Sequence, residues 1–294
     1  MTSVPLGATI TMTLWASCYP IITLSIPYAP VMLTAFFRAI LAGLSLVLIA
    51  FILKRPLPRK MKHWTFIVGV GLTATSVGFW GMFYASDLIS PGLATVINST
   101  QPLIAGVLGW FILKEHMDRL AIFGTFLGFL GISIISVQSL FFWERQLISG
   151  ITYIIAAATG IAISNILLKK MAAEIDILYA MGFQLLIGSI PLGIFALNRQ
   201  APLAIDWHYV WIVISLALPG TAVPFVIWYW LMDKAPLYRL NIYSFLTPMI
   251  GLALGRIFFT EVLSLNQWIG IIMIIAAIKL VSMNKKSFQK SSIE

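Results

Sequence analysis

Long apolar stretches with almost no charged residues follow one another along the entire chain. Each is close to the roughly 20 residues that an α-helix needs to cross the hydrocarbon core of a bilayer. The ten stretches cover residues 4–24, 30–52, 64–85, 91–113, 120–140, 149–168, 177–197, 208–231, 238–259 and 264–283. This pattern predicts an all-α integral membrane protein with ten transmembrane helices.

The composition argues against a water-soluble globular fold. Of the 294 residues, 60% are hydrophobic and 10% are charged, whereas soluble domains carry about 25% charged residues. The net charge of +9 does not predict a nucleic-acid partner, because the basic residues lie in short gaps between the apolar stretches. The predicted solvent of this chain is therefore a lipid bilayer.

The first apolar stretch starts near Val4, with no basic segment before it and no cleavage site after it. These features predict a retained helix rather than a signal peptide. The single cysteine, Cys18, lies inside this stretch, so it can form no intrachain disulfide and belongs to no metal-ligand cluster. Neither a metal nor another cofactor is predicted.

Lysine and arginine are distributed unequally between the two sides of the predicted bundle. The linker 54–62 alone carries five of them. Thirteen lie on the side of this linker and two, Arg145 and Arg199, on the other, with four more inside or at the ends of the stretches. Because cytoplasmic loops are enriched in Lys and Arg, we expect both termini, including the basic tail 285–294, to lie on the cytoplasmic side of the inner (cytoplasmic) membrane.

The two halves of the sequence repeat one another at an offset of 146 residues. The matching pairs are Pro56 and Pro202, Thr75 and Thr221, Phe79 and Phe225, Asp87 and Asp233, Pro102 and Pro248, Gly109 and Gly255, Glu115 and Glu261, and Gly124 and Gly270. The predicted repeats are residues 1–140 and 149–284, with five helices each. Because five is odd, the second repeat is predicted to be inverted, and its linker 200–208 lacks the basic residues of 54–62. Inverted repeats are a recurrent architecture of secondary transporters, with the substrate site near the midplane.

Polar residues are spaced three apart in the predicted fourth and ninth helices, and each set ends just before a proline. The first set is Thr95, Asn98 and Gln101 before Pro102, and the second is Asn241, Ser244 and Thr247 before Pro248. Proline has no N–H, so the carbonyl four residues earlier also lacks its helical partner. A symmetric substrate-binding surface is the predicted role, and hydrogen bonding between helices is the alternative.

Several aromatic residues lie well inside the stretches, away from the interfaces where membrane aromatics usually gather. They are Trp15, Tyr19, Trp80, Tyr84 and Trp228. Stacking on a planar or cationic substrate is one predicted role, and filling space between helices is the other. Asn165, a polar residue in the middle of the sixth stretch, is a further candidate for the substrate site.

Four of the ionisable residues within or at the ends of the stretches are candidates for a specific role. An arginine at mid-membrane is costly unless it faces protein or water, so Arg38 either binds an anionic substrate group or hydrogen-bonds helix-end carbonyls. Arg256 is a candidate gate or substrate residue. Glu115 and Glu261 end their stretches and are predicted to act at helix junctions rather than as proton carriers. Residues 264–267, Ser-Leu-Asn-Gln, fit a capping box for the last helix.

Two segments carry a resemblance to a known family. Residues 90–115 and 236–261 each place a proline in mid-helix and a glutamate thirteen residues later, and both resemble the fourth helix of the EamA-type repeat in the drug/metabolite transporter superfamily. Residues 15–17, Trp-Ala-Ser, and 37–39, Phe-Arg-Ala, resemble the first-helix and second-helix motifs of that repeat. The resemblance implies ten helices and the transport of small metabolites, mostly by export, through a cavity lined by helices 1, 3, 4, 6, 8 and 9. A departure is Gln184, which stands where the second repeat matches Arg38.

These features predict a secondary transporter that exports small polar or amphipathic metabolites, such as amino acids, by alternating access. No HExxH, GxSxG or Walker sequence is present, so neither an enzyme nor an ATP-driven pump is predicted. Proton antiport and uncoupled facilitated export are both open, as are a monomer and a homodimer. A non-transporting membrane receptor or scaffold is the second class of function that the sequence allows.

Overall fold

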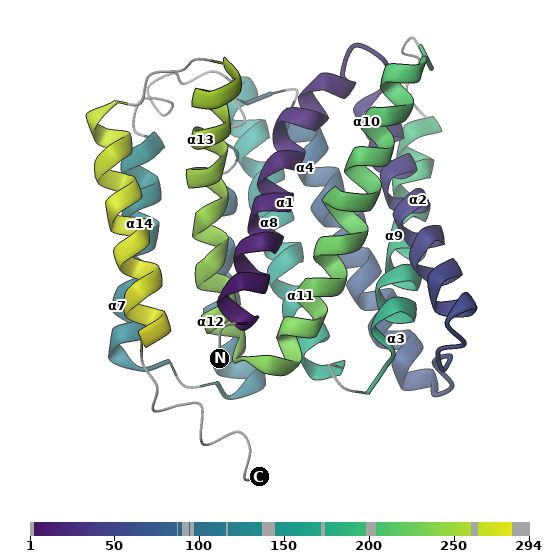
Figure 1. Cartoon of the computed structure of the whole chain (residues 1–294), viewed down its shortest axis with the longest axis horizontal. Coiled ribbons are helices and arrows are strands. Elements are labelled where there is room, and N and C mark those ends of the chain that lie inside the picture. The colour runs from purple at the N-terminus through teal and green to yellow at the C-terminus, as the bar shows by residue number, and fades with distance from the viewer. Residues whose placement is uncertain are drawn as a thin grey trace.

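The computed structural model describes residues 3–86, 88–89, 94, 97–115, 117–136, 145–171, 174–197, 204–259 and 264–283. In these residues all regular secondary structure is helical, and the helices run alongside one another in a single bundle (Figure 1). The longer α-helices are α1 (Ser3–Ser25), α2 (Val31–Ile52), α7 (Arg119–Ser136), α8 (Arg145–Met171), α9 (Ile177–Leu197) and α14 (Leu265–Met283). The shorter ones are α3 (Met61–Val70), α4 (Gly78–Ser86), α6 (Gln101–Leu108), α10 (Trp207–Ala217), α11 (Val223–Lys234), α12 (Leu237–Asn241) and α13 (Leu246–Phe259).

Five helical segments of the described chain are long and apolar enough to cross a membrane: Val31–Ile52, Met61–Ser86, Ile148–Met171, Ile177–Leu197 and Trp207–Lys234. The bundle also leaves large apolar side chains exposed on its outside, such as Phe51 at 72% and Ile194 at 58%. An outer surface of this kind is stable against lipid tails but not against water. The chain is therefore a multi-pass membrane protein.

Two of the spanning segments contain a π-helical turn in their middle. Segment η1 (Gly71–Val77) joins α3 to α4, and η4 (Leu218–Ala222) joins α10 to α11. Shifted by 146 residues, η1 corresponds to 217–223, a range that contains η4. In η4, Pro219 supplies no N–H to the helical hydrogen-bond ladder. Single π-helical turns inside α-helices are frequent at functional sites.

The predicted fourth and ninth helices are not straight α-helices in the described residues. A turn at residues 99–100 precedes α6, and a 3₁₀ segment, η5 (Ile242–Phe245), separates α12 from α13. Pro102 and Pro248 lie in the first turn of α6 and of α13, where a backbone N–H has no intrahelical partner to lose. The described polar residues before these prolines therefore lie at helix breaks and not on one continuous helical face.

Glycines allow two pairs of helices to pack very closely. A Cβ atom on Gly182 of α9 would lie 3.1 Å from the backbone nitrogen of Val47 in α2, and one on Gly270 of α14 would lie 2.4 Å from the backbone oxygen of Gly131 in α7. Small residues at such crossings let helix backbones approach, which drives association where lipid removes the hydrophobic force. The α2–α9 and α7–α14 pairs are thus tight contacts on the two flanks of the bundle (Figure 1).

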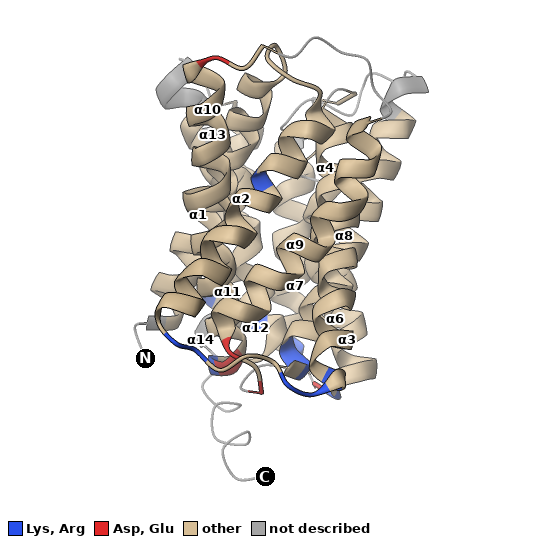
Figure 2. Cartoon of the chain, turned by 90° about the vertical axis from the view of Figure 1, so that its right-hand side faces the viewer, with Lys and Arg blue, Asp and Glu red and all other residues tan. Residues whose placement is uncertain are grey.

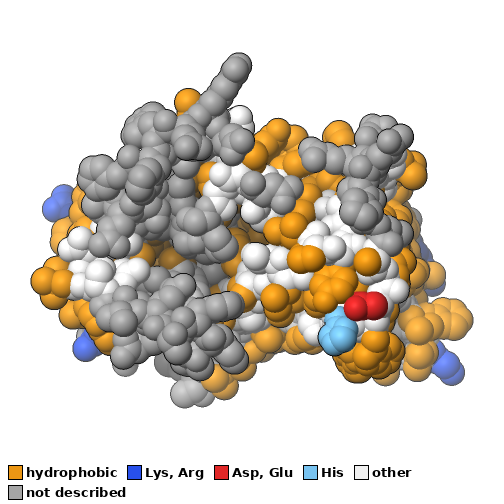
Figure 3. Space-filling model, turned by 90° about the horizontal axis from the view of Figure 1, so that it is seen from above, with side chains coloured by type: hydrophobic (Ala, Val, Ile, Leu, Met, Phe, Trp, Pro, Cys, Tyr) orange, Lys and Arg blue, Asp and Glu red, His pale blue; other side chains and the backbone are white. Residues whose placement is uncertain are grey.

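The charged residues of the described chain gather at one end of the bundle. Figure 2 shows most Lys, Arg, Asp and Glu at the end where α1 begins and α14 finishes. Figure 3 views the opposite end, where the described surface is mainly hydrophobic or uncharged, with one acidic side chain beside a histidine. The helix-start box predicted at residues 264–267 is confirmed, since Gln267 N donates to Ser264 Oγ and Ser264 N donates to Gln267 Oε1.

Candidate substrate cavity

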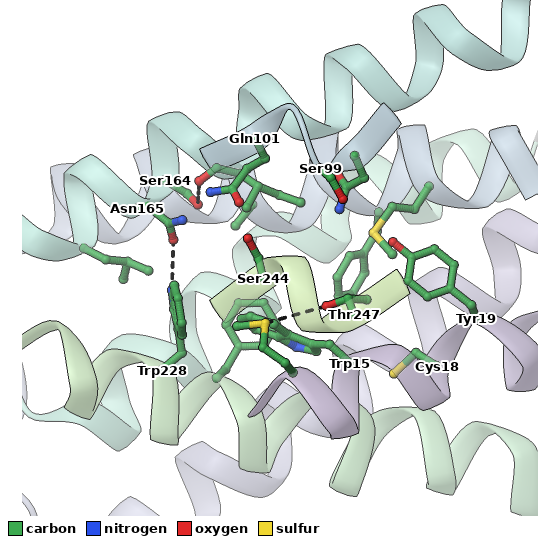
Figure 4. A pocket seen from close by; sticks show the side chains of 18 of the residues that line it. Trp15, Cys18, Tyr19, Ser99, Gln101, Ser164, Asn165, Trp228, Ser244 and Thr247 are labelled. Atoms are coloured by element: carbon green, nitrogen blue, oxygen red, sulfur yellow. Dashed lines mark hydrogen bonds between the residues drawn. The ribbon is translucent and has the colours of Figure 1, made fainter. Parts of the chain in front are cut away.

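A cavity of about 100 Å³ lies in the middle of the bundle. Its lining comes from α1, α2, η1, α4, α6 with the turn before it, α8, α11, η5 and α13 (Figure 4). These elements are drawn from both halves of the sequence. A ligand held there would contact side chains that are more than 200 residues apart in the chain, for example Met12 and Thr247, whose sulfur and hydroxyl oxygen lie 3.7 Å apart.

The helical repeat of α1 and α8 determines which of their side chains reach the cavity. Met12, Trp15 and Tyr19 of α1 line it, and their spacing of three and four residues places them on one helical face. Residues 161, 164, 165 and 168 of α8 line it with the same spacing. Ser164 and Asn165 provide the polar groups of this second face, and Ile161 and Leu168 provide its apolar flanks.

Aromatic rings form one wall of the cavity. The ring centroids of Trp15 and Trp228 are 5.5 Å apart, and those of Trp15 and Phe225 are 5.8 Å apart in an edge-to-face arrangement. Trp228 is 3% exposed, so its N–H needs a partner within the protein. Asn165 supplies it, because its side-chain oxygen accepts the Trp228 Nε1–H at 3.0 Å (Figure 4).

A buried amide cluster continues from Asn165 and joins four helices. Asn165 Nδ2 and Gln101 Nε2 each donate to Asn241 Oδ1 at 3.3 Å. With Trp228, the cluster thus connects α6, α8, α11 and α12. Hydrogen bonds between buried side chains hold them in a defined orientation, so the amide cluster orients Gln101, Asn165 and Trp228 at the cavity. Asn241 Nδ2 is buried in the cluster without a partner among the described residues.

Arg38 contributes a positive charge to the cavity lining. It lies in α2 and is 2% exposed. Its Nε donates to Thr221 Oγ1 at 2.6 Å, its Nη2 donates to the Gly220 carbonyl at 3.2 Å, and its guanidinium carbon lies 4.5 Å from the ring centroid of Phe79. Arg38 therefore both joins α2 to η4 and faces the cavity.

Eight of the eleven residues predicted to bind substrate lie in the lining. They are Trp15, Tyr19, Asn98, Gln101, Asn165, Trp228, Ser244 and Thr247. Asn241 is not in the lining but lies behind it, in the amide cluster. The structure does not bring Trp80 and Tyr84 to the cavity: both pack on Tyr153 of α8, with centroid distances of 4.9 and 5.5 Å. Their contacts there are ring against ring, as in the space-filling alternative.

The residues predicted to act at gates and junctions are placed as follows. Glu115 accepts from the backbone N–H groups of Leu237 and Tyr238, at 3.0 and 3.4 Å. A carboxylate at the start of α12 satisfies N–H groups that have no helical partner, so Glu115 joins two segments 122 residues apart. Glu261 and Thr95 lie outside the described residues, as does the side chain of Arg256.

Sequence reasoning missed several residues that line the cavity: Met12, Cys18, Ala74, Phe79, Met82, Ser99, Ile161, Ser164, Leu168 and Phe225. Some signals were present. Phe79 and Phe225 match each other at the 146-residue offset. Met12, Ile161 and Leu168 lie three or four residues from a predicted site residue, and Ser164 is adjacent to one. Met82 and Ala74 carry no signal that separates them from ordinary packing residues.

The arrangement is suited to binding a small molecule. Among the described residues, no group of three or more His, Cys, Asp or Glu side chains could hold a metal ion. The cavity combines aromatic walls, neutral amides and hydroxyls, and one guanidinium. Mostly apolar lining with a few convergent polar groups is typical of small-molecule sites. Fold and site together define a helical membrane protein with a small-molecule cavity enclosed between its two halves.

Comparison with known proteins identifies the family. The model of the EamA-like transporter family matches residues 3–137 and 148–283, and the chain belongs to this family. It is 26% identical to an uncharacterized transporter, YvbV, of Bacillus subtilis (strain 168), over 95% of this chain and 92% of the relative. It is also 26% identical to a probable amino-acid metabolite efflux pump of Salmonella typhimurium, over 92% of each chain.

A solved crystal structure shares the fold. It matches this chain with a TM-score of 0.82 at 15% sequence identity, and the match covers 98% of this chain and 99% of the other. At this identity the likeness concerns the fold alone. The helical arrangement described above is therefore one that an experimentally determined protein also adopts.

Proposed function

We propose that this protein is a secondary transporter that exports small polar or amphipathic metabolites, such as amino acids, by alternating access across the cytoplasmic membrane. The observation that carries the proposal is the central cavity, whose lining is shared between the two halves of the chain. A relative named as a probable amino-acid metabolite efflux pump supports the direction and the substrate class.

The proposed architecture is ten transmembrane helices in two inverted repeats, residues 1–140 and 149–284. The family model matches the chain twice, in one segment of each half. The π-helical turns η1 and η4 coincide at the 146-residue offset, as do the prolines that start α6 and α13. Two repeats packed around a common site can rock against each other to open it to one side at a time.

The proposed orientation places both termini in the cytoplasm. The end of the bundle where α1 begins and α14 finishes carries most of the described Lys and Arg (Figure 2). Basic residues in short loops favour the cytoplasmic side. A substrate released at the opposite end, where the described residues carry few charges (Figure 3), would leave the cell.

Uncoupled transport is the mechanism that the cavity favours. No Asp or Glu is found among its described lining residues, and proton-coupled carriers use such groups in the membrane to bind the proton. All described lining residues come from one chain, which supports transport by a monomer, and a homodimer stays the alternative. The proposed partners are the small-molecule substrate and the bilayer.

Flux through the purified protein in liposomes tests the proposal. Efflux of a panel of labelled amino acids is measured with and without a pH gradient, and we expect gradient-independent flux of at least one compound above protein-free liposomes. Asn98→Leu with Ser244→Leu removes polar groups from the cavity lining and is expected to lower this flux at least tenfold.

A matched control places the same number of leucines on the outside of the bundle. Thr65 and Thr152 are exposed and bond only their own helix backbone, so Thr65→Leu with Thr152→Leu is expected to keep wild-type flux. Unchanged flux in the cavity variant would remove the proposed site. Absence of flux for every compound in the wild-type protein would instead favour a receptor or scaffold.

A further inference from the structure

Arg38 is a buried cation without an anionic partner. It is 2% exposed, and in the part of the chain that the structure describes no carboxylate forms an ion pair with it. Its neighbours are a hydroxyl, a carbonyl, a thiol and the face of Phe79. These groups orient the guanidinium but leave its unit charge uncompensated in a low-dielectric setting, where a charge is costly.

In the second half of the chain, the residue that matches Arg38 makes the corresponding helix contact without a charge. Gln184 stands 146 residues after Arg38, and Thr75 stands 146 residues before Thr221. Thr75 Oγ1 donates to Gln184 Oε1 at 2.8 Å, which joins α9 to η1 as Arg38 joins α2 to η4. A neutral amide is therefore sufficient to link a helix of this kind to the neighbouring π-helical turn.

Position relative to the cavity separates the two side chains. Each keeps one buried nitrogen without a partner among the described residues, Nη1 of Arg38 and Nε2 of Gln184. Only Arg38 lines the cavity, and it is the one charged side chain among the described lining residues. The charge of Arg38 is thus placed where a ligand arrives.

We propose that Arg38 binds the carboxylate of the transported compound, so that the cavity selects compounds with a single carboxylate and an apolar body. This rests on the transport function proposed above. A single negative charge neutralises the guanidinium, whereas a phosphate dianion would leave one charge unbalanced. A charge-assisted hydrogen bond from a guanidinium to a carboxylate is also short and strong. Trp15, Phe225 and Trp228 provide the apolar surface for the body of the ligand.

Asn98 adds an acceptor to the same cavity. Its side-chain oxygen is buried and has no hydrogen-bond partner among the described residues, and Asn98 lines the cavity with Arg38. A carboxylate that also carries a hydroxyl or amino group can donate to this oxygen. Such a compound would satisfy both unpartnered groups, since leaving a buried polar atom unpaired is unfavourable.

Binding of two compounds that differ only in charge tests the proposal. The probes are 3-phenylpropanoate and its neutral amide, and the readout is their affinity for the detergent-solubilised protein from ligand-dependent thermal stabilisation. We expect the wild-type protein to bind the carboxylate at least tenfold more tightly than the amide. In Arg38→Gln, which copies the side chain of the other half, this preference is expected to disappear.

Two further variants separate ligand binding from a structural role. Thr221→Val removes the hydroxyl that accepts from Arg38 Nε but keeps the charge, so the protein should become less stable and still prefer the carboxylate. Arg38→Lys keeps a positive charge and should retain part of the preference. A phosphonate dianion, tested alongside, is expected to bind more weakly than 3-phenylpropanoate. Phenylalanine is expected to bind at least as tightly as 3-phenylpropanoate.

The proposal is overturned if the wild-type protein binds carboxylate and amide equally, if it binds neither, or if Arg38→Gln keeps the preference. Failure of the transport function has a different signature, because liposomes then show no flux for any compound. Flux without a preference for negative charge would leave transport intact and remove only the role of Arg38.

Discussion

Two crossings in the middle of the bundle occupy matching positions in the halves of the chain and differ in charge. In the charged crossing, Arg38 of α2 donates to Thr221 of η4. In the neutral crossing, Gln184 of α9 accepts from Thr75 of η1. Both sets of side chains are buried, so the two crossings face the same requirement for internal hydrogen bonds.

The backbones of the two crossings differ in the size of the residues between them. The neutral crossing has Gly71 and Gly188, and a Cβ on Gly188 would lie 2.4 Å from the carbonyl oxygen of Gly71. At the same offset the charged crossing has Ala217 and Ala42, both fully buried. We infer that the alanines hold α2 and η4 further apart, which leaves room for a guanidinium where the other half fits only an amide. The difference teaches that matching positions in the two halves can keep a helix contact while only one of them carries a charge.

The most severe way to break this comparison is to place a second charge in the neutral crossing. Gln184→Arg should destabilise the protein by about 3 kcal/mol, the cost of an arginine at the centre of a membrane helix, because position 184 is fully buried and closely packed among the described residues. Thermal unfolding in detergent measures the effect, with Gln184→Met as an uncharged control of similar length. Stability equal to that of the control would show that the neutral crossing has space for a charge.

A smaller effect is expected from widening the neutral crossing. Gly188→Ala adds a methyl group that would lie 2.5 Å from the Cβ of Thr75, and overpacking of this kind costs about 2 kcal/mol. The reverse change in the charged crossing, Ala42→Gly, should cost about 1 kcal/mol or less. The same unfolding assay compares the two variants. Equal costs would contradict the inferred difference in helix separation.

The threonines of the two crossings sharpen the comparison further. Thr221→Val leaves a charged N–H of Arg38 without its acceptor and should cost about 2 kcal/mol, whereas Thr75→Val leaves a neutral oxygen of Gln184 without its donor and should cost about 1 kcal/mol. Each variant serves as the control of the other, because the same atoms are exchanged at matching positions. If Thr75→Val lost more stability than Thr221→Val, the charged crossing would not be the one that depends more on its threonine.

The smallest predicted difference concerns the helix starts that lead into these crossings. Asp206 accepts the Tyr209 N–H at 2.8 Å at the start of α10, while Lys60, its counterpart, provides no side-chain cap to α3. The hydrogen bond from the Tyr209 backbone amide is the main cause that lowers the pKa of Asp206 below its ordinary value. The stabilisation is therefore present above the ordinary pKa and is lost as the pH falls through the lowered pKa of the folded state.

One variant tests whether Asp206 causes this pH dependence of stability. In Asp206→Asn the side chain still accepts a hydrogen bond but no longer titrates, so its unfolding temperature should change less between pH 6 and pH 3 than that of the wild-type protein. The difference is expected to be smaller than the effect of Thr75→Val, because Asp206 is exposed to solvent. Identical pH profiles for both proteins would show that the cap adds nothing to stability.

Much of the site could be predicted from the sequence because part of its signal is local. A polar or aromatic residue inside a 20-residue apolar stretch is visible without any structure, and Asn98, Asn165 and Trp228 were found in this way. Whether a side chain faces the cavity depends on how the helices pack, which neighbouring residues in the sequence do not determine. Trp80 carries the same signal as Trp15, yet it packs on Tyr153, because α4 presents Phe79 and Met82 to the cavity instead.

The amide cluster and the Glu115 contact could not be predicted for a similar reason. Asn241 accepts from Gln101, 140 residues away, and Glu115 accepts from backbone groups 122 residues away. The sequence indicated that these residues are costly to bury without partners, but the partners follow only from how the helices pack. The 3₁₀ turn in η5 likewise shifted Ser244 relative to Asn241 from the positions that a regular helix predicts.

The sequence by itself determined the solvent of this protein, its helical secondary structure and its internal repetition. Transfer to lipid is a sum over neighbouring residues, so apolar stretches determine it without reference to the fold. The tertiary structure decided which of the two matching positions lines the cavity. Arg38 and Gln184 occupy matching positions in the two halves, and both join a helix to a π-helical turn. Only the packing of the helices places Arg38 at the cavity and Gln184 away from it.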